Sequence, residues 1–322
     1  MLRRATDEVQ VGLDPRWAVR VHGLTPERAE RLLRAGDRHV DDALPAPALD
    51  ALGAAGLLRP ATARARPVRA DLRPEALAHG LVRADGDGVA AVRRRSRSTV
   101  AVVGLGRAGA VVATTLAVAG VGTLLLDDPR VPGPEDPAGD GADRATALTG
   151  ALGLLAPRTR VRAARGPDRL LADAPDAVVT VSTDATDPAT ALLLLGADLP
   201  HLPVVTREAD ALVGPFVRPV RPGDDPLPCL RCLDLHRAAA DPAWPVVLAQ
   251  LVSPRVGARA AEPPAALATV AGGLAAAEVL AHLDGEEPRT SGAQYEIEVP
   301  SVAPRLRRWA AHPGCGCAAL VG

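Results

Sequence analysis

The 322-residue sequence contains no lysine and no asparagine, and all of its 37 basic residues are arginine. Without lysine, the chain cannot form a Schiff base, anchor pyridoxal phosphate, or build a phosphate loop that ends in Gly-Lys-Ser/Thr. Aromatic residues make up only 2% of the chain, and Phe, Tyr, Met and Ile occur once each. Ala, Leu and Val must therefore fill the core, a bias that a coding sequence rich in G and C explains.

The sequence also lacks an excess of charge of either sign, since 37 basic and 38 acidic residues give a net charge of −1. This balance argues against a protein built mainly to coat nucleic acid. Unbroken runs of 18 apolar residues are missing, as is a basic and then apolar leader at the N-terminus. We therefore expect a cytoplasmic protein that binds neither nucleic acid nor a membrane.

Residues 1–92 are predicted to form a small α+β module of winged-helix type. Val9–Leu13 and Trp17–Val21 alternate apolar and polar residues around a turn at Asp14-Pro15, which is typical of a hairpin. Three helices are expected after it, over residues 25–35, 46–55 and 74–79, the first begun by Thr25-Pro26.

This N-terminal module is electrically balanced, because its first 60 residues hold nine arginines and nine acids. DNA binding relies on an excess of positive charge that such a module lacks. A module of this shape binds a peptide instead, when the peptide adds a strand to the edge of the hairpin.

A polar, charged stretch over residues 85–98 separates the module from the rest of the chain. We place the domain boundary there and interpret its arginines as a solvated linker rather than a nucleic-acid patch.

Residues 97–322 are predicted to form a doubly wound, mostly parallel, Rossmann-like α/β domain. Apolar runs typical of buried parallel strands alternate with helical stretches. The expected strands are residues 99–104, 122–126, 177–181, 203–206 and 295–299. The expected helices are residues 109–119, 145–155 and 264–283. Gly272-Gly273, inside the last helix, predicts close helix packing there.

Gly104, Gly106 and Gly109 form a G-x-G-x-x-G motif directly after the first of these strands. Glycines at this spacing permit a tight turn and let backbone N–H groups approach a phosphate at the helix N-terminus. Asp127 follows 23 residues after Gly104, at the end of the next strand, where an acid suits a ribose hydroxyl. The motif alone leaves open whether the ligand is ATP, NAD or nothing.

The four cysteines occur as two close pairs, Cys229 with Cys232 and Cys315 with Cys317. Four thiolates in two pairs suit a tetrahedral Zn²⁺ site that joins two distant segments. Disulfides and ordinary buried thiols are the alternatives, and the first is disfavoured in a cytosolic protein. The tighter C-x-C spacing of the second pair is less typical of zinc than C-x-x-C.

Taken in order, these features resemble the ThiF/MoeB/HesA family, the bacterial relatives of the E1 ubiquitin-activating enzymes. The resemblance covers residues 97–320 and rests on the glycine loop, Asp127-Asp128, Ser182-Thr183-Asp184, and cysteine pairs joined through a long small-residue helix. Residues 1–90 resemble the precursor-peptide recognition domain fused to E1-like proteins in azole-forming peptide natural-product clusters. That second resemblance rests on Gln10–Pro15 and on the order of a hairpin followed by helices.

The first resemblance implies adenylation, in which ATP·Mg²⁺ and a peptide or protein C-terminal carboxylate give an acyl adenylate and pyrophosphate. It assigns the three glycines to the nucleotide loop, Asp127 to the ribose with Asp128 beside it in the cofactor site, and Asp184 to Mg²⁺. The family also uses an Asn and an Arg after the second strand, then a Lys in the following helix, to neutralise phosphate charge.

This chain departs from that pattern at each of the three donors. It has no Asn, residues 134–138 offer no Arg, and Arg144 stands where the family has Lys. Glu135 and Asp136 are expected to repel a triphosphate, and losing such donors typically costs orders of magnitude in rate. We hypothesise that Arg107, in the glycine loop, and Arg130 supply compensating charge.

Three functions therefore stay open. The first is an E1-like enzyme that adenylates a precursor peptide or small carrier protein; with all four cysteines on zinc it has no thiol for a thioester and stops at the adenylate. The second is a non-catalytic scaffold that binds a leader peptide and delivers it to a cyclodehydratase-type partner. The third, an NAD-dependent oxidoreductase, explains neither the cysteine pairs nor Ser182-Thr183-Asp184. The resemblance also implies a homodimer.

Overall fold

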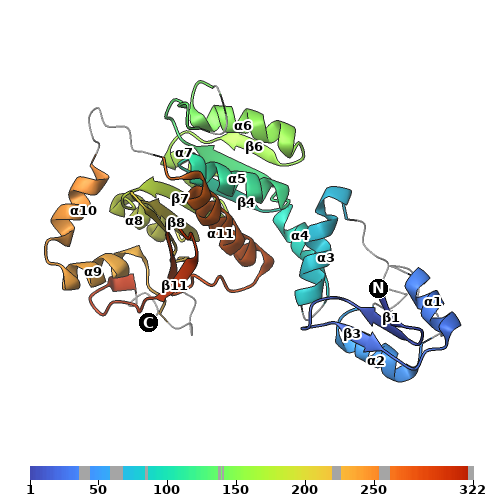
Figure 1. Cartoon of the computed structure of the whole chain (residues 1–322). Helices are drawn as coiled ribbons and strands as arrows, with labels where there is room; N and C mark the ends of the chain where they lie inside the picture. Colours follow the sequence, from blue (N-terminus) through green and yellow to red (C-terminus); the bar gives the residue numbers. More distant parts are fainter. Residues whose placement is uncertain are drawn as a thin grey trace. The chain divides into compact units, whose positions relative to one another are not determined.

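A computed structural model describes residues 1–35, 44–58, 68–83, 86–136, 139, 141–219, 226–253 and 262–317. The chain divides into two compact units, Met1–Val92 and Arg93–Gly322, and each has its own hydrophobic core (Figure 1).

The N-terminal unit contains a three-stranded antiparallel sheet in the order β1-β2-β3. The strands are β1 (Leu2–Ala5), β2 (Glu8–Val11) and β3 (Val19–Val21). β2 and β3 are the predicted hairpin, with Val9 opposite Val21. β1 was not predicted because all four of its residues are exposed and show no alternation in burial.

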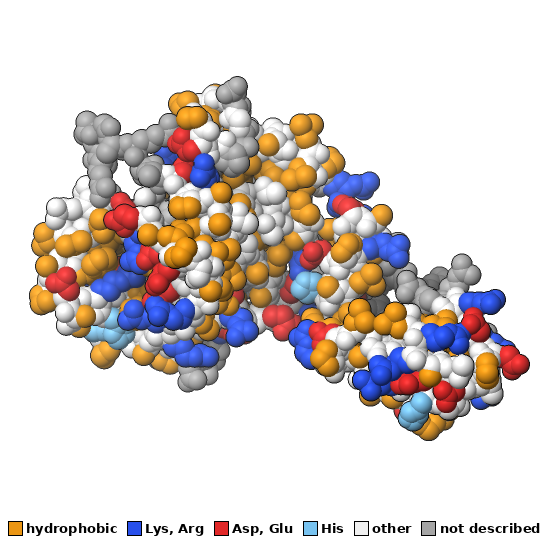
Figure 2. All heavy atoms as spheres, in the orientation of Figure 1, with side chains coloured by type: hydrophobic (Ala, Val, Ile, Leu, Met, Phe, Trp, Pro, Cys, Tyr) orange, Lys and Arg blue, Asp and Glu red, His pale blue; other side chains and the backbone are white. Residues whose placement is uncertain are grey.

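Helices complete this unit much as the sequence predicts. They are α1 (Pro26–Ala35), α2 (Ala46–Ala54) and α3 (Arg73–Val82), the last preceded by a 3-10 turn over Ala70–Leu72. The Thr25 hydroxyl caps α1 by accepting a hydrogen bond from the Arg28 N–H at 3.3 Å. Figure 2 shows arginines and acids interspersed over the visible face of this unit, in keeping with its balanced charge.

The stretch predicted to be a solvated linker is largely a helix, α4 (Gly88–Arg95); residues 84 and 85 lie outside the described part of the chain. The linker interpretation is wrong for Arg95, which is 0% exposed and donates hydrogen bonds to both carboxylate oxygens of Asp284, at 2.9 and 2.6 Å. Because a buried guanidinium needs such a partner, Arg95 belongs to the core of the C-terminal unit.

The C-terminal unit is built on an eight-stranded sheet in the order β11-β10-β9-β8-β7-β4-β5-β6. Five strands run parallel: β4 (Thr99–Val103), β5 (Thr123–Asp127), β6 (Arg160–Ala163), β7 (Ala177–Thr183) and β8 (His201–Thr206). Three antiparallel strands extend it: β9 (Asp210–Val213), β10 (Ala293–Glu298) and β11 (Pro304–Arg308). The predicted mostly parallel α/β class is confirmed.

Helices cover both faces of this sheet, as the doubly wound prediction requires. α5 (Arg107–Val118), α6 (Arg144–Leu155) and α11 (Ala265–Asp284) share one core with Val100 and Val102 of β4. The neighbouring residue Ala101 points to the opposite face, toward α7 (Pro167–Ala172) and α8 (Pro188–Gly196). Two further helices, α9 (Leu230–Ala240) and α10 (Trp244–Val252), follow β9 in the chain.

α11 is long and apolar enough to cross a membrane by length and composition, yet half of its apolar window is buried within the unit. It packs against α5 (Figure 1), and a Cβ on Gly272 would lie 2.7 Å from the Ala108 carbonyl oxygen. A Cβ on Gly273 would meet nothing within 4 Å. The predicted close packing therefore depends on Gly272 alone, and α11 serves as a core helix.

Candidate functional site

The strand order places the predicted site residues along one edge of the sheet. β5 and β6 lie on one side of β4 and β7 and β8 on the other, so the strand order reverses at β4. Ligands of open α/β sheets bind at such a reversal, outside the carboxyl ends of the strands. Gly104 follows β4, Asp127 ends β5, and Asp184 follows β7, so all three reach this edge.

The three glycines of the motif are required for different reasons. Gly104 has a φ of +86°, and a Cβ there would lie 2.1 Å from the Val181 carbonyl oxygen. A Cβ on Gly109 would lie 1.9 Å from the Gly104 carbonyl oxygen. These two glycines let strand, turn and helix pack closely. Only Gly106 faces an anion, since a Cβ there would lie 2.4 Å from both carboxylate oxygens of Glu262.

Glu262 is a site residue that the sequence analysis missed. Its Oε2 accepts a hydrogen bond from the backbone N–H of Arg107, the first residue of α5, at 2.9 Å. Its Oε1 accepts another from Arg144 at 2.7 Å. The positive end of a helix is where nucleotide folds receive a phosphate. Glu262 stands before two prolines, 153 residues beyond Gly109, and only the tertiary fold reveals its position.

Arg144, predicted to stand in for the family's lysine, is only 4% exposed and is held by acids of the protein itself. Its Nη2 lies 2.7 Å from Asp136 Oδ1 and 2.7 Å from Glu262 Oε1, and its Nη1 lies 3.6 Å from Asp128 Oδ2. Burial alone would lower the pKa of Arg144, but the hydrogen bond to Asp136 and the charge of Glu262 raise it. Asp136 is therefore a partner of this arginine, and its charge is neutralised within the protein.

The two arginines expected to compensate for missing donors also have partners. The Arg107 guanidinium donates to the backbone carbonyls of Glu135 at 3.1 Å and Pro263 at 3.2 Å. Arg130 donates to both carboxylate oxygens of Asp128, at 2.9 and 2.8 Å. Both guanidinium groups therefore have hydrogen-bond acceptors within the protein.

Asp128, predicted to lie in the cofactor site, is buried and holds the loops together. It accepts hydrogen bonds from the Leu105 N–H at 2.8 Å and from Arg130. Burial raises the pKa of Asp128, but the hydrogen bond and charge of Arg130 outweigh this and lower it overall. A carboxylate with these partners positions the glycine loop.

Asp127 and Asp184, the other two predicted acids, lie at the carboxyl ends of β5 and β7. Burial raises the pKa of Asp127. Asp184 has a φ of +69°, uncommon for a residue with a side chain, and its N–H donates to the Thr206 carbonyl at 2.8 Å. Asp184 also lines a cavity of about 770 Å³ whose walls are mainly apolar residues of α8, α9 and α10. Strain of this kind is found at functional sites more often than elsewhere.

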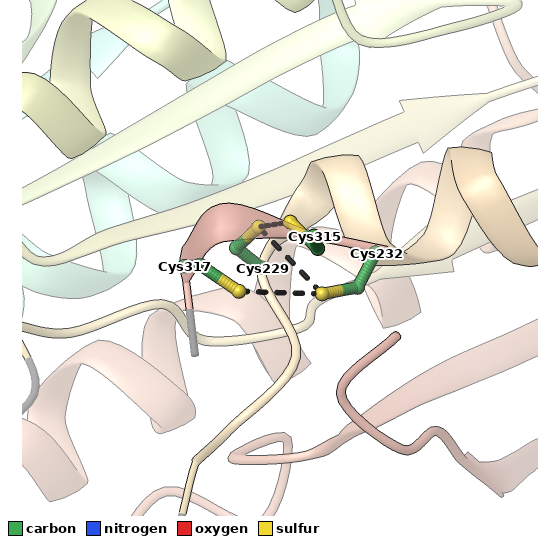
Figure 3. Close-up of side chains that lie close together, drawn as sticks. All are labelled: Cys229, Cys232, Cys315 and Cys317. Carbon is green, nitrogen blue, oxygen red and sulfur yellow. Dashed lines mark hydrogen bonds between the residues drawn. The ribbon is translucent and has the colours of Figure 1, made fainter. Parts of the chain in front are cut away.

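The four cysteines converge in a single buried cluster, as Figure 3 shows. Cys229 and Cys232 come from the start of α9, and Cys315 and Cys317 from the turn after β11. Sulfur–sulfur distances are 3.9 Å between Cys229 and Cys232, 3.6 Å between Cys229 and Cys315, and 3.4 Å between Cys232 and Cys317. All four sulfurs lie within 4.8 Å of one another, and none forms a disulfide.

This geometry fits a tetrahedral metal ion. Four thiolates about 2.3 Å from Zn²⁺ would be about 3.8 Å apart, close to the spacing observed. Burial raises the pKa of the Cys229 thiol to about 11, and a bound cation would favour its thiolate form. The disulfide alternative is excluded by the distances, and the cluster offers a metal such as zinc a complete set of ligands.

Comparison with known proteins gives matches at the level of structure only. No protein-family model and no curated protein matches the sequence. The crystal structure of E. coli MccB with ATP superposes with a TM-score of 0.66 and 14% identity, covering 97% of this chain and 98% of that one. PaaA superposes with a TM-score of 0.66 and 14% identity, covering 94% of this chain and 95% of that one. The chain has the fold of MccB.

MccB and PaaA are E1-like proteins of the ThiF/MoeB type, so the resemblance drawn from the motifs is confirmed for the fold. A further structure, the microcin C7 biosynthetic enzyme MccB in complex with N-formylated MccA, covers 96% of this chain at 14% identity and a TM-score of 0.63. The oxidoreductase interpretation finds no support in these comparisons.

Proposed function

We propose that this protein binds a precursor peptide and presents it to a partner enzyme of the cyclodehydratase type, without adenylating the peptide itself. The observation that carries the proposal is the state of the phosphate donors: Arg107, Arg130 and Arg144 all hydrogen-bond to groups of the protein. Together with the absence of Asn and Lys, this leaves a triphosphate few donors to engage.

Peptide binding is supported by the MccB fold. Crystal structures of MccB contain MccA, either N-formylated or labelled with selenomethionine. Both labels indicate that MccA is a polypeptide. In this chain, residues 1–92 are the proposed peptide-recognition domain and residues 97–322 the E1-like domain.

The N-terminal sheet has a suitable edge for a peptide. Among the described strands, β2 is paired on both sides, so the edge of the predicted hairpin that is open to a further strand is that of β3. A peptide adding to β3 gains main-chain hydrogen bonds with little dependence on sequence, and side-chain pockets then select it. Zinc at the four cysteines, a homodimer and a cytoplasmic location complete the proposal.

The second candidate is the adenylating enzyme, which Asp127, Asp184 and the intact glycine loop favour. The MccB structure with ATP adds to its support. In that function Asp184 would hold Mg²⁺ and Asp127 the ribose.

Two measurements on the zinc-loaded full chain separate the candidates. Fluorescence anisotropy with labelled peptides encoded beside the gene should show saturable binding, with hydrogen-exchange protection at β3 and not at β1. Exchange of labelled pyrophosphate into ATP should stay at background with and without peptide. Peptide-dependent exchange would instead establish adenylation.

A further inference from the structure

We infer that Glu262 determines ligand specificity at the glycine loop: its carboxylate occupies the phosphate position and excludes phosphate-bearing ligands. The inference rests on the proposed function, because it names the residue that closes the nucleotide site of the E1-like domain. It implies that removing the charge of this one side chain allows the domain to bind a nucleotide.

The contacts of Glu262 are of the kind that a helix N-terminus offers to a phosphate. One oxygen is bonded to the N–H of Arg107 at the start of α5, the other to the guanidinium of Arg144, and both lie against Gly106. A twelve-residue helix and a buried arginine thus converge on one anion. Charge-assisted hydrogen bonds of this type are about twice as strong as neutral ones.

A second observation is an unused hydrogen-bond donor beside Glu262. Nη1 of Arg144 is buried and has no hydrogen-bond partner within the described ranges of the chain. Oδ2 of Asp128 lies 3.6 Å from this nitrogen, an ion-pair distance rather than a hydrogen bond. A carboxylate has two oxygens and a phosphoryl group three, so the larger anion would have an oxygen for this donor.

Charge balance explains why Glu262 and a phosphate exclude each other. The hydrogen-bonded cluster holds Arg107, Arg130 and Arg144 together with three carboxylates, those of Asp128, Asp136 and Glu262. Its formal charge is zero, so a triphosphate entering beside Glu262 would place several uncompensated negative charges in a mostly buried region. Removal of the negative charge of Glu262 would leave the cluster with a net positive charge, which favours the binding of an anion.

The test is the affinity of the zinc-loaded full chain for ATP·Mg²⁺ and for inorganic pyrophosphate, measured by calorimetry. Glu262→Gln keeps the size of the side chain and removes its charge. We expect this variant to bind both probes at least about tenfold more tightly than the wild type, the effect of about one charge-assisted hydrogen bond. Glu298→Gln is the matched control, because its side chain is 65% exposed on β10, and it should bind like the wild type.

Equal affinities for wild type and Glu262→Gln would overturn the inference, and would mean that Glu262 only fastens the start of α11 to α5. If Glu262→Gln does not fold, as judged by circular dichroism, Glu262→Ala replaces it. Alanine also removes the carboxylate that accepts hydrogen bonds from the Arg107 N–H and from Arg144, so affinity should still rise; no rise would again overturn the inference.

Peptide anisotropy on the same preparations keeps the two claims apart. If the wild type does not bind the peptide, the proposed function is contradicted, and the affinity for pyrophosphate still decides the role of Glu262. If the wild type binds the peptide but Glu262→Gln gains no affinity for pyrophosphate, the inference about Glu262 is contradicted and the proposed function stands.

Discussion

The cysteine cluster and the glycine loop show opposite relations between a motif and its ligand. At the cluster, four sulfurs within 4.8 Å converge on one point, and no cation of the described chain is bonded to them. At the loop, a carboxylate of the protein already bonds to the donors. The first site offers its ligands to an ion from outside, whereas at the second a side chain takes the place that we infer for a phosphate.

The glycine motif therefore predicts the path of the backbone better than it predicts whether a ligand binds there. Gly104 and Gly109 satisfy packing demands that any protein with this strand, turn and helix would share. Whether a phosphate then binds depends on residues elsewhere in the chain. The following predictions test this contrast, from the largest expected effect to the smallest.

Removing a ligand of the cysteine cluster should have the largest effect. Cys232→Ser, or treatment with a strong chelator, should release the metal and lower the melting temperature by more than about 10 °C, since metal binding here is folding free energy. Metal analysis and thermal unfolding check this, with Ser253→Ala, at the exposed end of α10, as control. If the Cys232→Ser variant retains its metal and its melting temperature, the contrast between the cysteine cluster and the glycine loop is wrong.

Breaking the glycine-loop cluster from its cationic side should come next. Arg144→Met removes the cationic partner of the Asp136 and Glu262 carboxylates, and should cost about 3–5 kcal/mol of unfolding free energy. Adding Glu262→Gln should recover part of the loss, because one unpaired charge disappears. Urea unfolding of the single and double variants measures the coupling; strictly additive losses would show that the two residues do not interact.

Alanine at two motif glycines should separate packing from ligand approach. The Cβ of Gly109→Ala would meet a backbone oxygen at 1.9 Å, so strand and helix must move apart at a cost of at least about 1–3 kcal/mol. The Cβ of Gly106→Ala would meet the end of the Glu262 side chain, which can swing away at smaller cost. Equal destabilisation in thermal unfolding would contradict the division of roles.

Asp127 should show the smallest effect, and a pH-dependent one. Its pKa is raised by burial, so its carboxyl favours folding below the ordinary pKa of 3.8 and loses that contribution as pH rises through the folded value. Asp127→Asn should therefore melt above the wild type near pH 7, the difference vanishing toward about pH 3.

Asp143, at the N-cap of α6, has a pKa lowered by its hydrogen bond with Thr146. It is the control, because its contribution to stability changes with pH in the opposite direction. Its contribution is present above the ordinary carboxyl pKa and is lost as pH falls. A lower melting temperature for Asp127→Asn near pH 7 would mean that Asp127, like Asp128, is structural.

Much of the fold could be predicted, because the parallel strands β4, β5, β7 and β8 of the C-terminal unit are largely apolar runs with helices between them. β6, β9 and β11 escaped prediction. β6 and β11 are mostly exposed edge strands with arginine at alternate or adjacent positions, and β9 is only four residues long. The sequence predicted that the two cysteine pairs form one cluster, because pairs at this spacing are typical of metal sites.

The state of the nucleotide site could not be predicted. Glu262, Asp136 and Arg144 are separated by up to 126 residues, and their pairing depends on how α11 begins beside α5. Arg95 is a similar case: an arginine run in sequence looks solvated, and only the fold brings Asp284 to it.

The most direct test of the central claim is a calorimetric titration of the zinc-loaded wild-type chain with ATP·Mg²⁺, with NAD⁺ as control. The account predicts no saturable binding of either nucleotide up to about 1 mM. Micromolar binding of ATP that is lost in Asp184→Ala would contradict it, and would make this protein an adenylating enzyme despite Glu262.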